Sequence, residues 1–122
     1  MLVGAATVFT VKDIATSIAH YRDALGFSPT FQWGEPVFYA CLCRDEVKLH
    51  LVAADKTKRL PGNGAICIFV RDVNALHAEL ASRGARIDKP PQDYAYGMRE
   101  FNVSDLDGNQ IFFGMGIGEE KE

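Results

Sequence analysis

With 122 residues, 48% of them hydrophobic and 24% charged, the chain has the length and composition of one globular domain rather than of a disordered segment. Its net charge of -3 at pH 7 lacks the basic excess that nucleic-acid binding needs. No apolar run approaches the roughly 20 residues that span a bilayer, and the N-terminus has no basic segment typical of a signal peptide. We therefore expect a cytoplasmic protein with neither nucleic-acid nor membrane partners.

The first half of the chain predicts a strand, a helix and three further strands. Apolar residues recur every three or four positions over 14–25, as in an amphipathic helix. Asp13 is the expected N-cap, and Gly26 is expected just after the helix because glycine tolerates a positive φ. The strands, rich in β-branched and aromatic residues, are expected at Ala6–Val11, Thr30–Trp33, Val37–Cys43 and Val47–Val52.

The second half predicts the same order of elements after a polar linker at 54–63. A strand at Ala65–Val70 precedes a helix that Asp72 caps. Pro90 and Pro91 favour a loop rather than a strand after the next short strand. The expected segments are Arg86–Asp88 as a strand, Lys89–Gly97 as a loop, Met98–Val103 and Gln110–Gly114 as strands, and 116–122 as a frayed tail.

A tetrapeptide of the same pattern stands at the start of both predicted helices, as Val11-Lys12-Asp13-Ile14 and as Val70-Arg71-Asp72-Val73. One half of this size cannot bury its own apolar face, whereas two halves together can enclose a core or a cavity. We therefore predict one α+β domain made of two paired βαβββ modules, at about 5–53 and 64–115. Their strands would form an eight-stranded cup-like sheet with the helices outside.

Three stretches of the sequence resemble the vicinal oxygen chelate superfamily, the group of glyoxalase I, extradiol dioxygenases, fosfomycin resistance enzymes and bleomycin resistance proteins. The resemblance covers nearly the whole chain, from about residue 6 to 114, and implies the paired βαβββ fold. The stretches are Val11–Ile14 with His20–Phe27, Phe69–Val73, and Gly97–Phe101 with Asp105–Ile111.

The resemblance also implies where a catalytic metal would be bound, by His, Gln or Glu on the first and fourth strands of each module. The matching positions here are Ala6, Ala65 and Phe112, with His50 as the one side chain able to ligate. A catalytic divalent ion needs about three protein ligands and one open position. We therefore expect no catalytic metal and no cofactor.

Within the superfamily the chain is similar to the bleomycin resistance proteins in finer detail, at Arg44–Leu49, Phe69–Arg71 and Arg99–Phe101. That resemblance implies a homodimer whose ligand clefts lie at the subunit interface, are lined by aromatic residues, and sequester a bulky cationic glycopeptide antibiotic. The sequence favours such a ligand-binding protein over an enzyme and leaves the identity of the ligand open.

Aromatic residues supply most of the candidate ligand contacts. Those on the predicted strands either pack in the core or form a stacking surface for a flat ligand, and those on the predicted loop suit ligand contact. His50 either lines the cleft or is a hydrogen-bonded strand histidine, and Glu35, Asp93 and Glu100 are either a negative rim or solvated charges. The candidate ligand-binding residues are Phe31, Trp33, Phe38, Tyr39, His50, Tyr94, Tyr96, Met98 and Phe112.

Two other functions remain open from the sequence. One is a metal-dependent lyase, isomerase, thiol transferase or dioxygenase that uses displaced ligands, such as His50 with Glu100 or Glu35. The other is a regulatory protein whose cup binds a metabolite or a peptide. The odd number of cysteines argues against a disulfide framework, and Cys41, Cys43 and Cys67 are expected to be small core residues.

Overall fold

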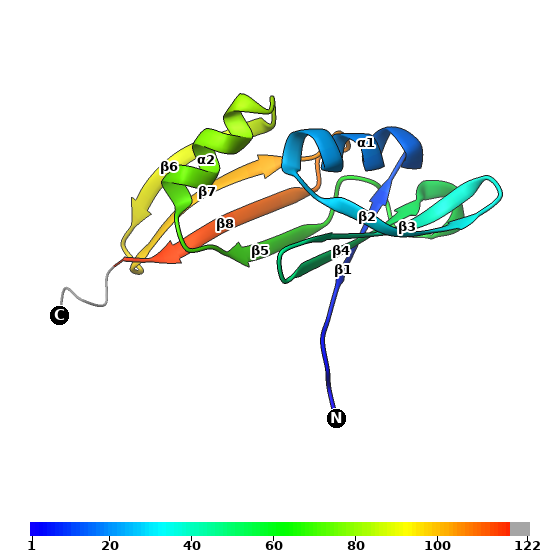
Figure 1. Ribbon diagram of the computed structural model, residues 1–122, viewed down its shortest axis with the longest axis horizontal. Helices are drawn as coiled ribbons and strands as arrows, with labels where there is room; N and C mark the ends of the chain where they lie inside the picture. The colour runs from blue at the N-terminus through cyan, green and yellow to red at the C-terminus, as the bar shows by residue number, and fades with distance from the viewer. Residues whose placement is uncertain (118–122) are drawn as a thin grey trace.

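Two βαβββ modules follow one another in the computed structural model, which describes residues 1–117 (Figure 1). The first module holds α1 and four strands, and the second holds α2 and four strands. The bounds are β1 Thr7–Val11, α1 Ile14–Leu25, β2 Ser28–Gly34, β3 Val37–Arg44, β4 Val47–Ala53, η1 Ala54–Lys56, β5 Ala65–Phe69, α2 Val73–Ser82, β6 Arg86–Tyr94, β7 Met98–Ser104 and β8 Gln110–Gly116.

The strands form two four-stranded sheets of the same topology. The first sheet has the order β1-β4-β3-β2 and the second has the order β5-β8-β7-β6. In each sheet the first and last strands of the module pair in parallel, and the remaining pairs are antiparallel. The α+β class and the paired modules are thus confirmed, and within the chain the eight strands divide their hydrogen bonds between two sheets.

Both helices begin at the aspartates that the sequence indicates. The carboxylate of Asp13 accepts a hydrogen bond from the Thr16 amide at 3.0 Å, and that of Asp72 accepts one from the Ala75 amide at 3.0 Å. Each bond satisfies a donor that the first helical turn would otherwise leave unpaired. Helix α1 ends where Gly26 takes a φ of 74°, a left-handed conformation that suits glycine.

The predicted loop at Lys89–Gly97 is wrong, because β6 continues to Tyr94. This strand lies at the edge of its sheet, where proline's missing N–H removes no ladder bond, and its register shifts between Lys89 and Gln92 to accommodate the two prolines. The tail was expected to fray from residue 116, yet Gly116 pairs with Met98 in the ladder. Residues 118–122 lie outside the described part of the chain.

A buried polar cluster joins the two modules. The phenol of Tyr21, on α1, donates to Oδ2 of Asp105 at 2.8 Å. The same carboxylate accepts from the backbone amide and the side chain of Asn109, both at 2.9 Å, and Asn109 also donates to the carbonyl of Thr10 at 3.1 Å. Tyr21, Asp105 and Asn109 are each at most 1% exposed. We call these three residues the Asp105 cluster.

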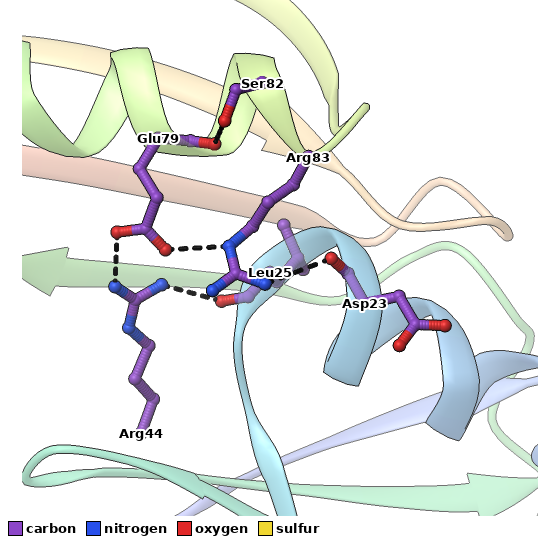
Figure 2. Close-up of polar contacts among 6 residues, drawn as sticks. All are labelled: Asp23, Leu25, Arg44, Glu79, Ser82 and Arg83. Atoms are coloured by element: carbon purple, nitrogen blue, oxygen red, sulfur yellow. Dashed lines mark hydrogen bonds and ion pairs between the residues drawn. The ribbon is translucent and has the colours of Figure 1, made fainter.

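A second set of polar contacts lies nearer the surface, where α1 and α2 approach one another (Figure 2). Glu79 on α2 accepts from Arg44 at 2.7 Å and from Arg83 at 2.8 Å. Arg44 also donates to the carbonyl of Leu25 at 2.9 Å, and Arg83 donates to that of Asp23 at 3.2 Å. The modules therefore meet through their helical sides. Among residues 1–117, no helix has the length and apolarity needed to cross a membrane.

Candidate ligand-binding site on the open faces of the sheets

Each sheet packs one face against its helix and leaves the other face open. Along β4, Leu49 and Leu51 are fully buried on the helix side, whereas Lys48, His50 and Val52 alternate with them and are not buried. Because side chains alternate along a strand, the pairing register assigns every residue of the sheet to one face or the other. We call the face turned away from the helix the open face.

Two cross-strand rows make up the centre of the open face of the first sheet. Residues directly opposite each other on neighbouring strands bring their side chains together on the same face. One row runs Phe31, Cys41, His50 and Val8, and the next runs Trp33, Tyr39, Val52 and Thr10.

Phe31 and Trp33 form an exposed stacked pair on the edge strand of this face. Their ring centroids are 6.1 Å apart and their planes differ by 12°. They are 52% and 61% exposed, so the alternative of core packing does not hold for them. Large rings left this open to water mark a contact surface more often than a folding requirement.

Tyr39 and His50 form a polar pair beside these rings. The Tyr39 hydroxyl lies 2.8 Å from Nδ1 of His50, and the two rings meet edge to face at 5.5 Å. Burial raises the pKa of Tyr39, so the phenol keeps its proton at neutral pH. The structure thus gives His50 the hydrogen bond expected of a strand histidine and still leaves it on the open face.

A second stacked pair lies at the β6–β7 turn of the second sheet. The rings of Tyr94 and Tyr96 are 5.4 Å apart, with 9° between their planes. Tyr96 is 66% exposed, and its hydroxyl donates to Oε1 of Glu100 at 3.1 Å. Partial loss of solvent around the phenol, and after it the hydrogen bond to Glu100, raises the pKa of Tyr96.

Phe112 and Met98 extend the open face of the second sheet beyond the two tyrosines. Phe112 pairs across the sheet with Cys67, and Met98 pairs with Tyr94. A Cβ atom at Gly114 would come within 3.1 Å of the Met98 methyl group, so this glycine makes the room that Met98 occupies. Both sequence-predicted residues are partly buried and lie with the tyrosines on the open face.

The structure does not bring Phe38 and Asp93 to these faces. Because side chains alternate along β3, Phe38 lies on the same face as the buried Ala40 and opposite to Tyr39. The Lys56 ammonium lies 5.2 Å from the centroid of the Phe38 ring. Asp93 forms an ion pair with Arg99 at 2.9 Å. The Nε of Arg99 in turn donates to the side-chain oxygen of Asn74 on α2. Of the three candidate rim carboxylates, Glu100 lies on an open face.

Sequence reasoning missed Phe69 and misassigned the cysteines. Phe69 is 75% exposed on β5, in register with Gly114, and alternation with the buried Ile68 is the signal that could have revealed it. Cys41 and Cys43 are partly buried and Cys67 is exposed, so the expectation of three core cysteines is wrong. All three lie on open faces, where no helix covers them.

The residues at the positions that the resemblance assigns to metal ligands do not fit a metal. Ala6, Ala65 and Phe112 offer no donor atom, so His50 is the one side chain at these four positions that could ligate, and one imidazole is no coordination site. Within residues 1–117, no three His, Cys, Asp or Glu side chains are grouped so as to hold an ion. The open faces therefore offer rings and a few hydrogen-bonding groups rather than a coordination sphere.

A separate hollow of about 650 Å³ lies between the modules on the helical side. Its lining includes the apolar residues Leu25, Phe27 and Phe113 and the charged residues Arg44 and Glu79. None of the nine candidate ligand residues lines it. We place the candidate site on the open faces because the exposed stacked rings are there.

Comparison with known proteins connects this geometry to a family. The sequence profile of the Glyoxalase/Bleomycin resistance protein/Dioxygenase superfamily matches residues 5–113. No curated protein sequence matches the chain. A solved bleomycin-binding protein from bleomycin-producing Streptomyces verticillus, complexed with copper(II)-bleomycin, is 30% identical, with a TM-score of 0.76 and 98% of each chain covered.

Two further solved structures share the architecture. A glyoxalase/bleomycin resistance protein from Catenulispora acidiphila is 28% identical, with a TM-score of 0.76, and the match covers 93% of this chain and 98% of that one. A superfamily member from Sphaerobacter thermophilus is 24% identical, with a TM-score of 0.80, and covers 94% of this chain and 98% of its own. The last supports the fold alone.

Proposed function

Because the chain belongs to the Glyoxalase/Bleomycin resistance protein/Dioxygenase superfamily over residues 5–113, we propose that it is a metal-free binding protein that sequesters a bulky, partly aromatic small molecule. The observation that carries the proposal is the exposed stacked aromatic pair on each open face, Phe31 with Trp33 and Tyr94 with Tyr96. In this function the ligand is buried and released unchanged. A toxic ligand held in this way is kept from its target, which is the basis of antibiotic resistance by sequestration.

Stacking on these rings is energetically sufficient for such a role. An aromatic side chain buries about 150–250 Å² when covered, and stacking of a flat group on one is worth about 1–3 kcal/mol. Three such contacts at the upper end of this range approach the roughly 8 kcal/mol of micromolar affinity, and polar groups such as Glu100 and His50 orient the ligand. The carboxylate of Glu100 suits a cationic ligand.

We propose that the cleft forms between two copies of the chain. The turn of the β2–β3 hairpin, which follows Trp33 and Gly34 at the end of β2, and the β6–β7 turn, which holds Tyr96, lie at opposite ends of the molecule (Figure 1). One ligand therefore cannot contact both aromatic pairs of one chain. A two-fold axis sets the first sheet of one copy against the second sheet of the other, which gives two equivalent clefts per homodimer.

The relative that binds bleomycin supports the ligand class. It is 30% identical over 98% of both chains and was solved with copper(II)-bleomycin. Bleomycin is thus the first ligand to test. Free thiols at all three cysteines fit a reducing compartment, which agrees with action in the cytoplasm.

The contacts of the open faces speak against the metal-dependent enzyme. Such a site would have to combine His50 with Glu100 or Glu35. His50 is engaged by Tyr39 on the first sheet, whereas Glu100 is engaged by Tyr96 on the second. An interface cleft that brings the two sheets together would supply one imidazole and one carboxylate, fewer than the three or so ligands that catalysis by a divalent ion needs.

Calorimetric titration with metal-free bleomycin and with copper(II)-bleomycin tests the proposal. We expect saturable binding that Trp33→Ala and Tyr96→Ala each weaken by about 5- to 150-fold, the equivalent of one lost stacking contact. Leu60→Ala is the matched control, because Leu60 is 68% exposed and belongs to the linker rather than to a strand of either sheet. If Trp33→Ala and Tyr96→Ala bind bleomycin as tightly as wild type and Leu60→Ala do, the site lies elsewhere.

A further inference from the structure

We propose that Cys41 is a nucleophile that covalently captures flat α,β-unsaturated carbonyl compounds, of which quinones are the best-fitting class. The inference deepens the proposed function and rests on it, because the stacked rings of Phe31 and Trp33 hold the flat compound beside the thiol. It adds a bond-forming step to a site that the sequence predicts to sequester its ligand.

Cys41 occupies the middle of a cross-strand row on the open face. Phe31 is its register partner on β2, and His50 is its register partner on β4. Side chains directly opposite one another on antiparallel strands have Cβ atoms about 4.5–5.5 Å apart. The register therefore places the Cys41 side chain between those of Phe31 and His50 on the same face.

Tyr39 completes the arrangement by holding the imidazole. Its hydroxyl oxygen lies 2.8 Å from Nδ1 of His50. When Nδ1–H donates to this oxygen, the tautomer leaves Nε2 unprotonated and able to act as a base. A nucleophile, a base and a group that orients the base are the three parts of an activated thiol.

The chemistry needs no further reactant. The Cys41 proton moves to Nε2 of His50, and the sulfur forms a bond to the β-carbon of the unsaturated carbonyl. The electron pair of the carbon–carbon double bond shifts toward the carbonyl oxygen, and His50 returns the proton to the resulting enolate. With a quinone, the hydrogen at the new C–S carbon then moves to the second carbonyl oxygen. The product is a hydroquinone thioether, with no leaving group and no external oxidant.

The two other cysteines provide internal controls. Cys43 lies on the same face, but its register partners are Ser28 and Lys48, and its thiol donates to the carbonyl of Asp45 at 3.4 Å. Cys67 is the most exposed of the three. Partial loss of solvent around the sulfur and, after it, the nearby Glu100 carboxylate raise the pKa of the Cys67 thiol, which lowers its reactive thiolate fraction. Exposure alone predicts that Cys67 reacts first. The neighbouring His50 and Phe31 predict instead that Cys41 reacts first.

The test is limited labelling with 1,4-naphthoquinone, followed by intact mass and peptide mapping. We expect one adduct, on Cys41, formed at least about 10-fold faster than the adduct on Cys67. His50→Gln should slow labelling of Cys41 by about 100-fold, the usual size of a lost general base, and leave the rate at Cys67 unchanged. An unchanged Cys67 rate also reports that the variant is folded. First labelling at Cys67, or an equal Cys41 rate in His50→Gln, overturns the inference.

A second readout separates this inference from the proposed function. Trp33 is the one tryptophan of the chain, so quenching of its fluorescence reports stacking on the first sheet without any covalent step. One outcome is that naphthoquinone quenches the fluorescence of Cys41→Ser saturably while the wild type forms no adduct on Cys41. This outcome overturns covalent capture and leaves reversible binding intact. Quenching together with a Cys41 adduct that Trp33→Ala slows, while labelling by iodoacetamide keeps its rate, supports the inference.

Discussion

Tyr21→Phe tests whether the Asp105 cluster holds the two modules together. Tyr21 is fully buried, and its hydroxyl donates to Asp105 at 2.8 Å. Burial and the Asp105 carboxylate raise the pKa of Tyr21, so the phenol is a donor at pH 7. The substitution removes this bond while keeping the ring and its packing. Since a hydrogen bond to a charged group is worth about 1.5–3 kcal/mol, we expect a loss of about 2 kcal/mol in the free energy of unfolding.

Thermal and urea unfolding at pH 7, followed by far-UV circular dichroism at one protein concentration, measure this loss. An unfolding entropy of about 2.1 cal/mol/K per residue converts 2 kcal/mol into a fall in Tm of roughly 8 °C. Tyr96→Phe is the matched control, because it removes a phenol bond of 3.1 Å at a site that is 66% exposed. The control should cost less than about 0.5 kcal/mol. Equal, small losses in both variants would refute the claim that the buried bond joins the modules.

Two further predictions concern the helix contacts and the metal. Hydrogen bonding to Arg44 lowers the pKa of Glu79, so its contribution to stability is present above the usual carboxyl pKa and is lost as the pH falls through the lowered value. Because Glu79 is partly exposed, Glu79→Gln should cost less than about 1 kcal/mol at pH 7 in urea unfolding. That difference from wild type should shrink steadily as the pH falls below the usual carboxyl pKa, and a difference that stays constant down to the acid limit of the fold would contradict the assignment. Added Zn²⁺, Ni²⁺ or Mn²⁺ should leave the Tm within about 1 °C, whereas tight stoichiometric binding that a chelator reverses would contradict the metal-free proposal.

Local signals were sufficient to predict the helices. Asp13 and Asp72 were identified as caps because a side chain that bonds the first helical turn acts within three residues of itself. The bounds of α1 are the predicted ones for the same reason. The long β6 was missed because proline argues against a strand until its place in the sheet is known. At an edge with a register shift, Pro90 and Pro91 are tolerated.

The composition of the strands does not reveal which face is open. Phe31, Phe38 and Tyr39 are all aromatic, yet Phe38 turns to the helical side while the other two lie on the open face. The sequence shows apolar residues on both faces, so alternation gives two faces without saying which one a helix covers. The cysteines were misassigned for this reason. Cysteines usually prefer the interior, but these three lie on the faces that no helix covers.

The most direct test of the interface cleft is a complementation experiment with two binding-deficient chains. Trp33→Ala damages the first sheet and Tyr96→Ala damages the second, so every cleft is defective in either homodimer. If each cleft uses the first sheet of one copy and the second sheet of the other, a mixed dimer contains one doubly defective and one intact cleft. Random exchange makes about half of the dimers mixed, which restores about a quarter of the wild-type sites at wild-type affinity for bleomycin. Calorimetry that finds no wild-type-affinity sites after complete exchange would contradict the interface cleft.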